Sequence, residues 1–205
     1  MRVMIVGAGP AGLYAAILLK RSRPDLDIRI VEQNDANVTF GFGVVFSDQA
    51  LAFLRHDDPE TADLIEPHMK HWNDITLVHA GQRITIDGIG FSGIGRLELL
   101  RHLQARAETL QIFPEFKEPI RNSAELSDFD LVIGADGFHS TVRRAAPEIF
   151  GEEITVSGNH FAWFGADREF DTLTQTFIDT PYGPMNSHHY LSLIHISEPT
   201  RPRLI

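Results

Sequence analysis

The fold of this chain is decided by residues 2–32, which read RVMIVGAGPAGLYAAILLKRSRPDLDIRIVE. Residues 2–6 are β-branched and apolar on both faces, which is typical of a buried parallel strand. Residues 13–20 are rich in Ala and Leu and predict a helix, and residues 28–31 predict the next strand, which ends at Glu32. The stretch therefore predicts one compact βαβ unit.

The turn between the first strand and the helix has the glycine spacing GxGxxG. Gly7 permits the tight turn, Gly9 lets the backbone approach a pyrophosphate, and Gly12 lets the helix pack closely on the strand. The phosphates then lie on the positive end of the helix, whose first N–H groups have no internal partner. Glu32, about twenty residues later, can accept hydrogen bonds from ribose hydroxyls and repels a 2′-phosphate. We expect this unit to hold FAD or NAD rather than NADP; the alternative is a tight turn whose glycines serve packing alone.

Composition narrows the classes of partner. The 205 residues carry a formal net charge of −10, which argues against nucleic acid and anionic membranes, since both need a basic face. The absence of cysteine excludes a disulfide scaffold, a thiolate metal site and a cysteine nucleophile. The longest nearly apolar run, residues 3–19, is interrupted by glycines and a proline and is short for a membrane span. The absence of cysteine is compatible with the cytoplasm, where we expect the protein to be. His68 and His71 could share a helical face but have no third ligand nearby in the sequence, so no metal site is expected.

The middle of the chain alternates glycine-rich and regular segments. We expect loops at residues 40–46 and 88–95, because both are rich in glycine, the first with aromatic residues as well. A hairpin with a short glycine turn is predicted over residues 75–87, and a helix over residues 96–110. Arg96 begins that helix, where its cation can meet a phosphate or ribityl oxygen; the alternative is a solvated arginine of the first helical turn.

The most specific segment is residues 128–143, which read DFDLVIGADGFHSTVR. A buried strand at residues 131–133 ends in small residues and an acid, and a turn that closes with Ser140 and Arg143 follows. Together with the glycine turn, this segment resembles the flavoprotein aromatic hydroxylases, which are single-component FAD monooxygenases. The resemblance implies an α/β protein: a Rossmann-like FAD-binding domain interleaved with a β-sheet substrate domain that is incomplete in this chain.

The resemblance also implies which residues contact the cofactor. The glycine turn and Glu32 match the positions that hold the ADP half of FAD, and the Asp-Gly pair at 136 and 137 matches residues near the FAD pyrophosphate. The implied cofactor contacts are Gly7, Gly9, Pro10, Ala11, Gly12, Glu32, Gln33, Val45, Arg96, Asp136 and Gly137.

A closer resemblance, over most of residues 1–190, is to one subgroup of this family. The matching blocks are residues 39–48, 71–75, 90–96 and 161–165. The subgroup contains the salicyloyl-CoA and 2-aminobenzoyl-CoA hydroxylases and the tryptophan-derivative hydroxylase of violacein synthesis. It implies hydroxylation of a small aromatic substrate, in one form an aryl-CoA thioester, with NAD(P)H and O₂.

On the substrate side the candidates are Phe46, Trp163, His188 and Tyr190. The last two match the first and third positions of the subgroup's His-Ala-Tyr segment, whereas His189 departs from it at the second. No catalytic residue is assigned. The alternatives are another FAD enzyme of the same architecture, such as a halogenase or a prenyl reductase, and a nucleotide-binding fragment without activity.

The resemblance sets the expected domain boundaries. Residues 1–73 and 94–150 are expected to form the FAD-binding domain, and residues 74–93 and 151–190 part of the substrate domain. Residues 191–201 match, codon for codon, the translation of a transposase sequencing adaptor, so we expect residues 191–205 to be a non-native tail. We then expect the chain to be the N-terminal part of a longer enzyme, without the later GD motif of the family, and to bind FAD poorly and be inactive alone.

Overall fold

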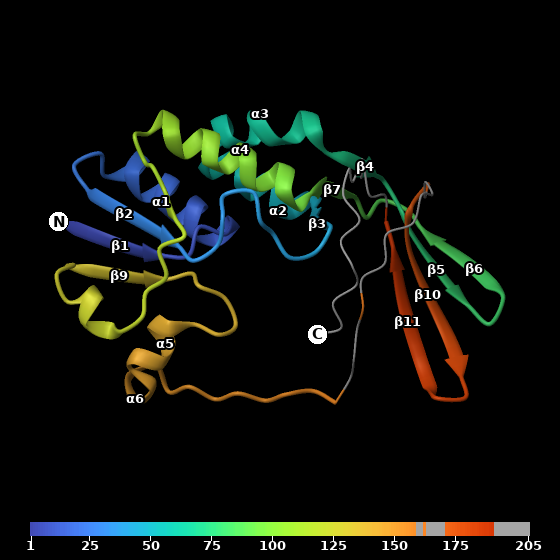
Figure 1. Ribbon diagram of the computed structural model, residues 1–205. Coiled ribbons are helices and arrows are strands. Elements are labelled where there is room, and N and C mark those ends of the chain that lie inside the picture. Colours follow the sequence, from blue (N-terminus) through green and yellow to red (C-terminus); the bar gives the residue numbers. More distant parts are fainter. Residues whose placement is uncertain (159–161, 163–170, 191–205) are drawn as a thin grey trace. The chain divides into compact units, whose positions relative to one another are not determined.

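The computed structural model describes residues 1–158, 162 and 171–190. Trp163 and the expected tail at 191–205 lie outside the described residues. The chain divides into two compact units, of which unit 1 is residues 1–39 and 99–160 and unit 2 is residues 40–98 and 161–205. Figure 1 shows both units with the labels used below.

Unit 1 is built on a parallel sheet with the strand order β8-β2-β1-β9. The strands are β1 (Arg2–Val6), β2 (Asp27–Glu32), β8 (Glu115–Phe116) and β9 (Leu131–Gly134). The central strand β1 has β2 on one side and β9 on the other, as Figure 1 shows. Val3, Met4 and Ile5 are fully buried, because a central strand of a parallel sheet is covered on both faces.

Helices complete the predicted βαβ unit. Helix α1 (Pro10–Ser22) connects β1 to β2, packs on both strands, and buries Leu13, Ala16 and Ile17. Unit 1 also contains the part of α4 (Arg96–Thr109) from Leu99 onward, and three short helical segments. These are η2 (Ser123–Leu126), α5 (Thr141–Ala145) and α6 (Pro147–Phe150). The α/β class and the Rossmann-like unit expected from the sequence are confirmed.

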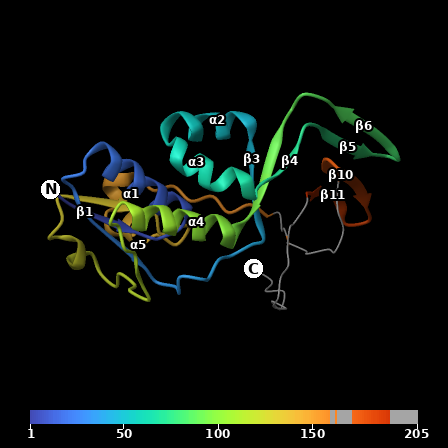
Figure 2. The ribbon, with the colours of Figure 1, turned by 90° about the horizontal axis from the view of Figure 1, so that it is seen from above.

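Unit 2 contains two sheets, seen from another side in Figure 2. One is antiparallel, with the order β3-β7-β4, from β3 (Gly43–Ser47), β4 (Lys70–Trp72) and β7 (Phe91–Gly95). The other has the order β11-β10-β5-β6, from β5 (Ile75–His79), β6 (Gln82–Ile86), β10 (Leu173–Thr180) and β11 (Gly183–His189). Helices α2 (Asp48–Asp57) and α3 (Pro59–Ile65) and the 3₁₀ turn η1 (Glu66–His68) lie between β3 and β4 in the chain.

The predicted hairpin is confirmed as β5 and β6. Its turn residues Ala80 and Gly81 have φ values of 49° and 76°, as a two-residue hairpin turn with positive φ at both positions requires. The two expected loops are partly wrong, because residues 43–47 and 91–95 form strands. Glycine lowers strand propensity, but a Cβ on Gly93 would lie only 2.9 Å from the indole of Trp72. The glycine there makes room for a large buried ring within a sheet, and is not a loop signal.

The compact units do not coincide with the expected domain boundaries. Residues 40–73 and 94–98 group with the hairpin in unit 2, whereas they were assigned to the FAD-binding domain from the sequence. Compactness and ligand binding are different properties, so the assignment of ligand-binding domains stays a prediction. Among the described residues, no helix is long and apolar enough to cross a membrane.

Candidate functional site

The glycine turn leaves the end of β1 and begins α1. Gly7 has a φ of 107°, and its N–H donates to the carbonyl of Val31 at 2.8 Å. A Cβ on Gly7 would overlap the carbonyl of Ala135, and a Cβ on Gly12 would overlap the carbonyl of Gly7. Packing alone therefore requires glycine at these two positions, in agreement with the alternative that the sequence left open for the turn.

Gly9 is different, because packing does not explain it. A Cβ built on Gly9 would have no atom within 4 Å. Gly9 is the N-cap residue of α1 without a side-chain cap, Pro10 follows at the first helical position, and the first turn has no acidic residue. The first N–H groups of this 13-residue helix have no partner within the helix, and its first turn carries no acidic side chain of its own. This cradle fits a pyrophosphate, and the exposed Ala11 lies at its rim.

Glu32 ties the end of β2 to the glycine turn. Its Oε2 accepts the N–H of Ala8 at 3.0 Å. Its Oε1 accepts the backbone N–H and the side-chain Nδ2–H of Asn34, both at 2.8 Å. Glu32 and Asn34 are half-buried, whereas Gln33 between them is exposed. Asn34 was not among the candidates from the sequence, although its side-chain amide is a hydrogen-bond donor only two residues after the motif acid.

The second motif lies directly beside the first. Gly134 at the end of β9 lies opposite Val6 at the end of β1, and the N–H of Ala135 donates to the carbonyl of Val6 at 2.7 Å. A Cβ on Gly12 would also lie 3.2 Å from the Cβ of Ala135. The carboxyl ends of two neighbouring parallel strands thus bring the glycine turn and the Asp-Gly segment together, which is where open α/β sheets bind ligands.

Asp136 holds the start of α5. Its carboxylate accepts the hydroxyl of Ser140 at 2.6 Å and the N–H groups of Thr141 and Val142 at 2.5 and 3.4 Å. Ser140, only 6% exposed, caps α5 by accepting the N–H of Arg143 at 3.0 Å. These contacts fix where the carboxylate lies beside the glycine turn, so Asp136 is a rigid element of the site.

Two neighbours complete the Asp-Gly turn. Gly137 is exposed and has a φ of 76°, a conformation that favours glycine. The guanidinium of Arg143 donates to the carbonyl of Phe138 and pairs with Glu152. Arg143, the arginine of the motif, therefore stabilises the turn through contacts within the protein.

Two ion pairs flank the ends of β2 and β8. Lys117, at 2.8 Å from Asp35, lowers the pKa of that carboxyl below its usual value, mainly through a hydrogen bond, and Asp35 raises the pKa of Lys117. Arg29 binds both oxygens of Glu115 at 2.9 and 2.7 Å and lowers its pKa in the same way. The ammonium of Lys117 pairs with Asp35. The contacts of the Glu32 carboxylate are those with Ala8 and Asn34.

In unit 2, Val45 and Phe46 follow one another in β3, so their side chains lie on opposite faces of the sheet. Val45 lies opposite Gly93, and Phe46 lies opposite Ser92. Tyr190 lies near the beginning of β3, where a Cβ on Gly43 would be 3.4 Å from its Cε2. Since Gly43 and Val45 share a face, the structure brings Tyr190 to the side of Val45 and leaves Phe46 on the other side.

Arg96 begins α4, and its N–H donates to the carbonyl of Phe42 at 3.0 Å. Its guanidinium is half-buried and makes no hydrogen bond or ion pair with any residue that the structure describes. A half-buried cation of this kind is suited to an anionic ligand group. Ser92, by contrast, is fully buried in the middle of β7, where its Oγ lies 2.6 Å from Nδ1 of His71.

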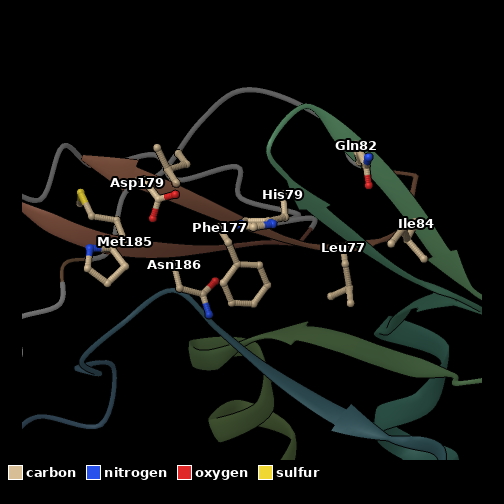
Figure 3. A pocket seen from close by; sticks show the side chains of 10 residues that line it. Leu77, His79, Gln82, Ile84, Phe177, Asp179, Met185 and Asn186 are labelled. Atoms are coloured by element: carbon tan, nitrogen blue, oxygen red, sulfur yellow. The ribbon is translucent and has the colours of Figure 1, made fainter. Parts of the chain in front are cut away.

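A hollow of about 640 Å³ lies at the sheet β11-β10-β5-β6, and most of its lining residues, Leu77 and Phe177 among them, share one face of the sheet. Figure 3 shows Leu77 and Phe177 pointing to the same side of this sheet. Its lining is Leu77, His79, Gln82, Ile84, Phe177, Ile178, Asp179, Pro184, Met185 and Asn186. His79 meets the edge of Phe177, with ring centroids 6.4 Å apart.

None of the substrate candidates within the described residues lines this hollow. His188 is exposed on β11 and lies opposite Gln175, which in turn lies opposite Leu77, so it shares the face of the hollow. The sequence analysis placed the hairpin correctly and did not select its side chains. The alternation of apolar residues within residues 75–79 could have indicated which side chains share one face of the hairpin.

Comparison with known proteins adds a family and several relatives. Residues 1–111 match the family of pyridine nucleotide-disulphide oxidoreductases. Salicyloyl-CoA 5-hydroxylase of a Streptomyces species is 42% identical over 190 residues, which cover 93% of this chain and 37% of that protein. The 3-hydroxy-4-methyl-anthranilyl-[aryl-carrier protein] 5-monooxygenase of Streptosporangium sibiricum is 30% identical, over 93% of this chain and 53% of that protein.

Protodeoxyviolaceinate monooxygenase of Chromobacterium violaceum is 31% identical, over 86% of this chain and 48% of that protein. The chain thus spans about two fifths to one half of the length of these relatives. Among solved structures, 2-methyl-3-hydroxypyridine-5-carboxylic acid oxygenase superposes with a TM-score of 0.65 at 19% identity, over 86% of this chain and 52% of that one. A variant of PqsL from P. aeruginosa gives 0.67 at 17% identity, over 93% and 57%. These likenesses establish a shared fold.

Proposed function

We propose, given that this chain belongs to the family of pyridine nucleotide-disulphide oxidoreductases, that unit 1 binds the ADP half of FAD. The observation that carries the proposal is the open space at Gly9, which packing leaves unexplained at the N-terminus of α1. The carboxylate of Glu32 and the capped Asp136 turn border the same glycine turn. In the proposed complex the N–H groups of the turn hold the pyrophosphate, and Glu32 accepts from the ribose hydroxyls.

The family's name includes disulphide chemistry, to which this chain contributes no residue, since its sequence has no cysteine. The curated relatives are named as hydroxylases or monooxygenases, and the sequence resemblance points to the same class. We therefore propose that the whole protein is an FAD-dependent aromatic monooxygenase that uses NAD(P)H and O₂ in the cytoplasm. The flavin supplies the redox chemistry when bound.

The chain's own residues would bind and orient the cofactor and the substrate and keep water away from them. Arg96 offers a half-buried cation without a partner in the described chain, which suits an anionic part of the cofactor. Val45, a cofactor candidate, and Tyr190, a substrate candidate, share one face of the β3 sheet, so we propose that they contact the same bound molecule. Phe46, another substrate candidate, lies on the opposite face of this sheet, and we propose that it does not contact that molecule. The described residues give no positioned general base, and none is proposed.

For the substrate we propose a small aromatic acyl group carried as a thioester. The support is that two of the relatives are named for aryl groups on CoA or on a carrier protein. His188 lies on the same sheet face as the apolar hollow and is the candidate polar contact beside it. Trp163, the other substrate candidate, lies outside the described residues.

Two measurements test these proposals separately. Titration of this chain with FAD should show one weak binding site, with the visible absorption band of the flavin shifted on binding; the absence of any binding by the folded chain contradicts the FAD proposal. The whole protein, incubated with salicyloyl-CoA, NADH or NADPH and ¹⁸O₂, should place one ¹⁸O atom on the ring. Oxidation of NAD(P)H without labelled product contradicts the proposed substrate class and leaves FAD binding intact.

A further inference from the structure

Asn34 makes an unusually complete set of contacts with the motif acid Glu32. Its backbone N–H and its side-chain Nδ2–H both donate to Oε1 of Glu32, at 2.8 Å each. Hydrogen bonds to an ionised carboxylate are stronger than neutral ones, and two donors on one oxygen fix the rotation of the carboxylate. Asn34 on Oε1, together with the N–H of Ala8 on Oε2, therefore sets where Oε2 of Glu32 points.

Asn34 is itself held in place by the backbone. Its carbonyl accepts the N–H of Lys117 at 3.1 Å, and the carbonyl of Glu32 accepts the N–H of Glu118 at 2.9 Å. The turn after β2 is thereby fastened to the segment after β8. Because the backbone of Asn34 is fixed on both sides, its amide group can orient Glu32 at a small further cost in conformational entropy.

The oriented carboxylate also keeps capacity for a ligand. A carboxylate has roughly four lone-pair sites. The structure uses three of them, two for Asn34 on Oε1 and one for the N–H of Ala8 on Oε2. Oε2, the oxygen on the side of the glycine turn, therefore retains a lone pair for one hydroxyl donor.

We infer that Asn34 is a positioning residue that aims Oε2 of Glu32 at a ribose hydroxyl of an adenine nucleotide. The inference rests on the proposed binding of the ADP half of FAD. The ligand chemistry it selects is a ribose with free hydroxyls next to a diphosphate. Asn34 acts through Glu32, so its effect should appear in discrimination between ribose and dideoxyribose and not only in overall affinity.

The experiment uses ADP and 2′,3′-dideoxy-ADP as probes in calorimetric titrations of the 205-residue chain. The wild type should bind ADP about tenfold or more tightly than dideoxy-ADP, because the second ligand leaves the charged acceptor without its donor. Asn34→Ala should weaken the binding of ADP about tenfold and that of dideoxy-ADP less than threefold. The ratio of the two affinities should therefore fall towards one. Asn34→Asp keeps the size of the side chain, removes its donor and adds a like charge, and should abolish the preference.

Asn37→Ala is the matched control. Asn37 lies in the same loop, and its Oδ1 accepts from Arg101 at 3.4 Å, away from Glu32. It should keep the wild-type preference. Circular dichroism and the unfolding midpoint of each variant establish that it is folded.

Each remaining outcome is decisive. Equal weakening of both ligands in folded Asn34→Ala means a merely structural role and overturns the inference, as does an unchanged preference. Equal affinity of the wild type for both ligands overturns it too, because Glu32 then accepts no hydrogen bond from a ribose hydroxyl. If the folded wild type binds FAD but neither ADP nor dideoxy-ADP, the inference fails and the proposed function stands; if it binds none of the three, both fail.

Discussion

The hydroxyl of Ser140 donates to Oδ1 of Asp136 at 2.6 Å, across the turn that opens α5. The same hydroxyl accepts the N–H of Arg143, so Ser140 connects the motif acid to the helix that follows it. Asp136 in turn accepts two N–H groups of that helix. Within the fold, the Asp-Gly motif therefore caps the N-terminus of α5 through these hydrogen bonds. The position of its carboxylate depends on Ser140, which is almost fully buried.

Removing this hydroxyl should destabilise the chain. Ser140→Ala loses the cap of α5 and leaves one oxygen of Asp136 without its donor, so we expect a loss of about 1–3 kcal/mol in the free energy of unfolding. Ser140→Thr should recover most of it. Urea titration followed by circular dichroism measures the difference. Ser127→Ala, which removes a hydrogen bond to the carbonyl of Ala124 on the exposed η2 turn, should change the stability by less than about 1 kcal/mol.

The glycines of the first turn should separate into two kinds. Gly7→Ala forces a Cβ into the carbonyl of Ala135 at a φ of 107°, and should cost more than about 3 kcal/mol or prevent folding. Gly9→Ala meets no atom within 4 Å and should fold with near-wild-type stability. The unfolding midpoints of the two variants check this order. Equal midpoints would contradict the packing argument for Gly7.

Strand β7 should tolerate a side chain at Gly95 and not at Gly93. Gly93→Ala places a Cβ 2.9 Å from the indole of Trp72, which is 3% exposed, so the ring must move and stability should fall by about 1–3 kcal/mol. Gly95→Ala on the same strand meets its nearest neighbour at 3.6 Å and should be tolerated. Chemical unfolding of both variants gives the comparison. A smaller loss for Gly93→Ala than for Gly95→Ala contradicts the close packing of Trp72.

The stability should also depend on pH in the acid range. Hydrogen bonds from their arginine partners lower the pKa of Asp25, to about 2, and that of Glu115. Because these folded-state pKa values lie below the unfolded ones, the stabilisation is complete above the unfolded pKa and is lost as the pH falls through the folded pKa. The free energy of unfolding should therefore decrease from about pH 4 to pH 2.

Glu115→Gln provides the comparison for this pH dependence. The glutamine does not titrate, so the variant should lose stability less steeply over the same range, because Arg29 no longer binds a titrating partner. Urea unfolding at half-unit pH steps measures both slopes. Identical slopes for the wild type and the variant contradict a contribution from this ion pair.

The sequence predicted those parts of the fold in which local pattern and tertiary environment agree. The apolar run of β1, the glycine spacing and the start of α4 at Arg96 each required one kind of local structure, and each formed as expected. The strand around Gly93 was missed because Gly93 makes room for the ring of Trp72, a contact from another strand that no local pattern reveals. The pairing of Val6 with Gly134, which joins the two motifs, is likewise a tertiary property.

The candidate site was predictable to the same extent. Motif spacing was enough to select Glu32 and Asp136 as candidates, since Glu32 ends β2 and Asp136 comes two residues after the end of β9. It could not show that Asn34 and Ser140 orient these acids, because a side chain's partner depends on how each turn closes. It also could not show that Val45 and Phe46 face opposite ways, since residues 40–46 were expected to form a loop.

The most direct test of the central claim is the affinity of the Gly9→Asp variant for FAD. A carboxylate at Gly9 enters open space and can cap α1, so the variant should fold at least as well as the wild type. It also places a negative charge where the pyrophosphate is expected, and FAD binding should weaken at least a hundredfold in calorimetric titration. Gly158→Asp, at another open position, is the matched control. Wild-type FAD affinity in folded Gly9→Asp would contradict the claim that the glycine turn holds the cofactor.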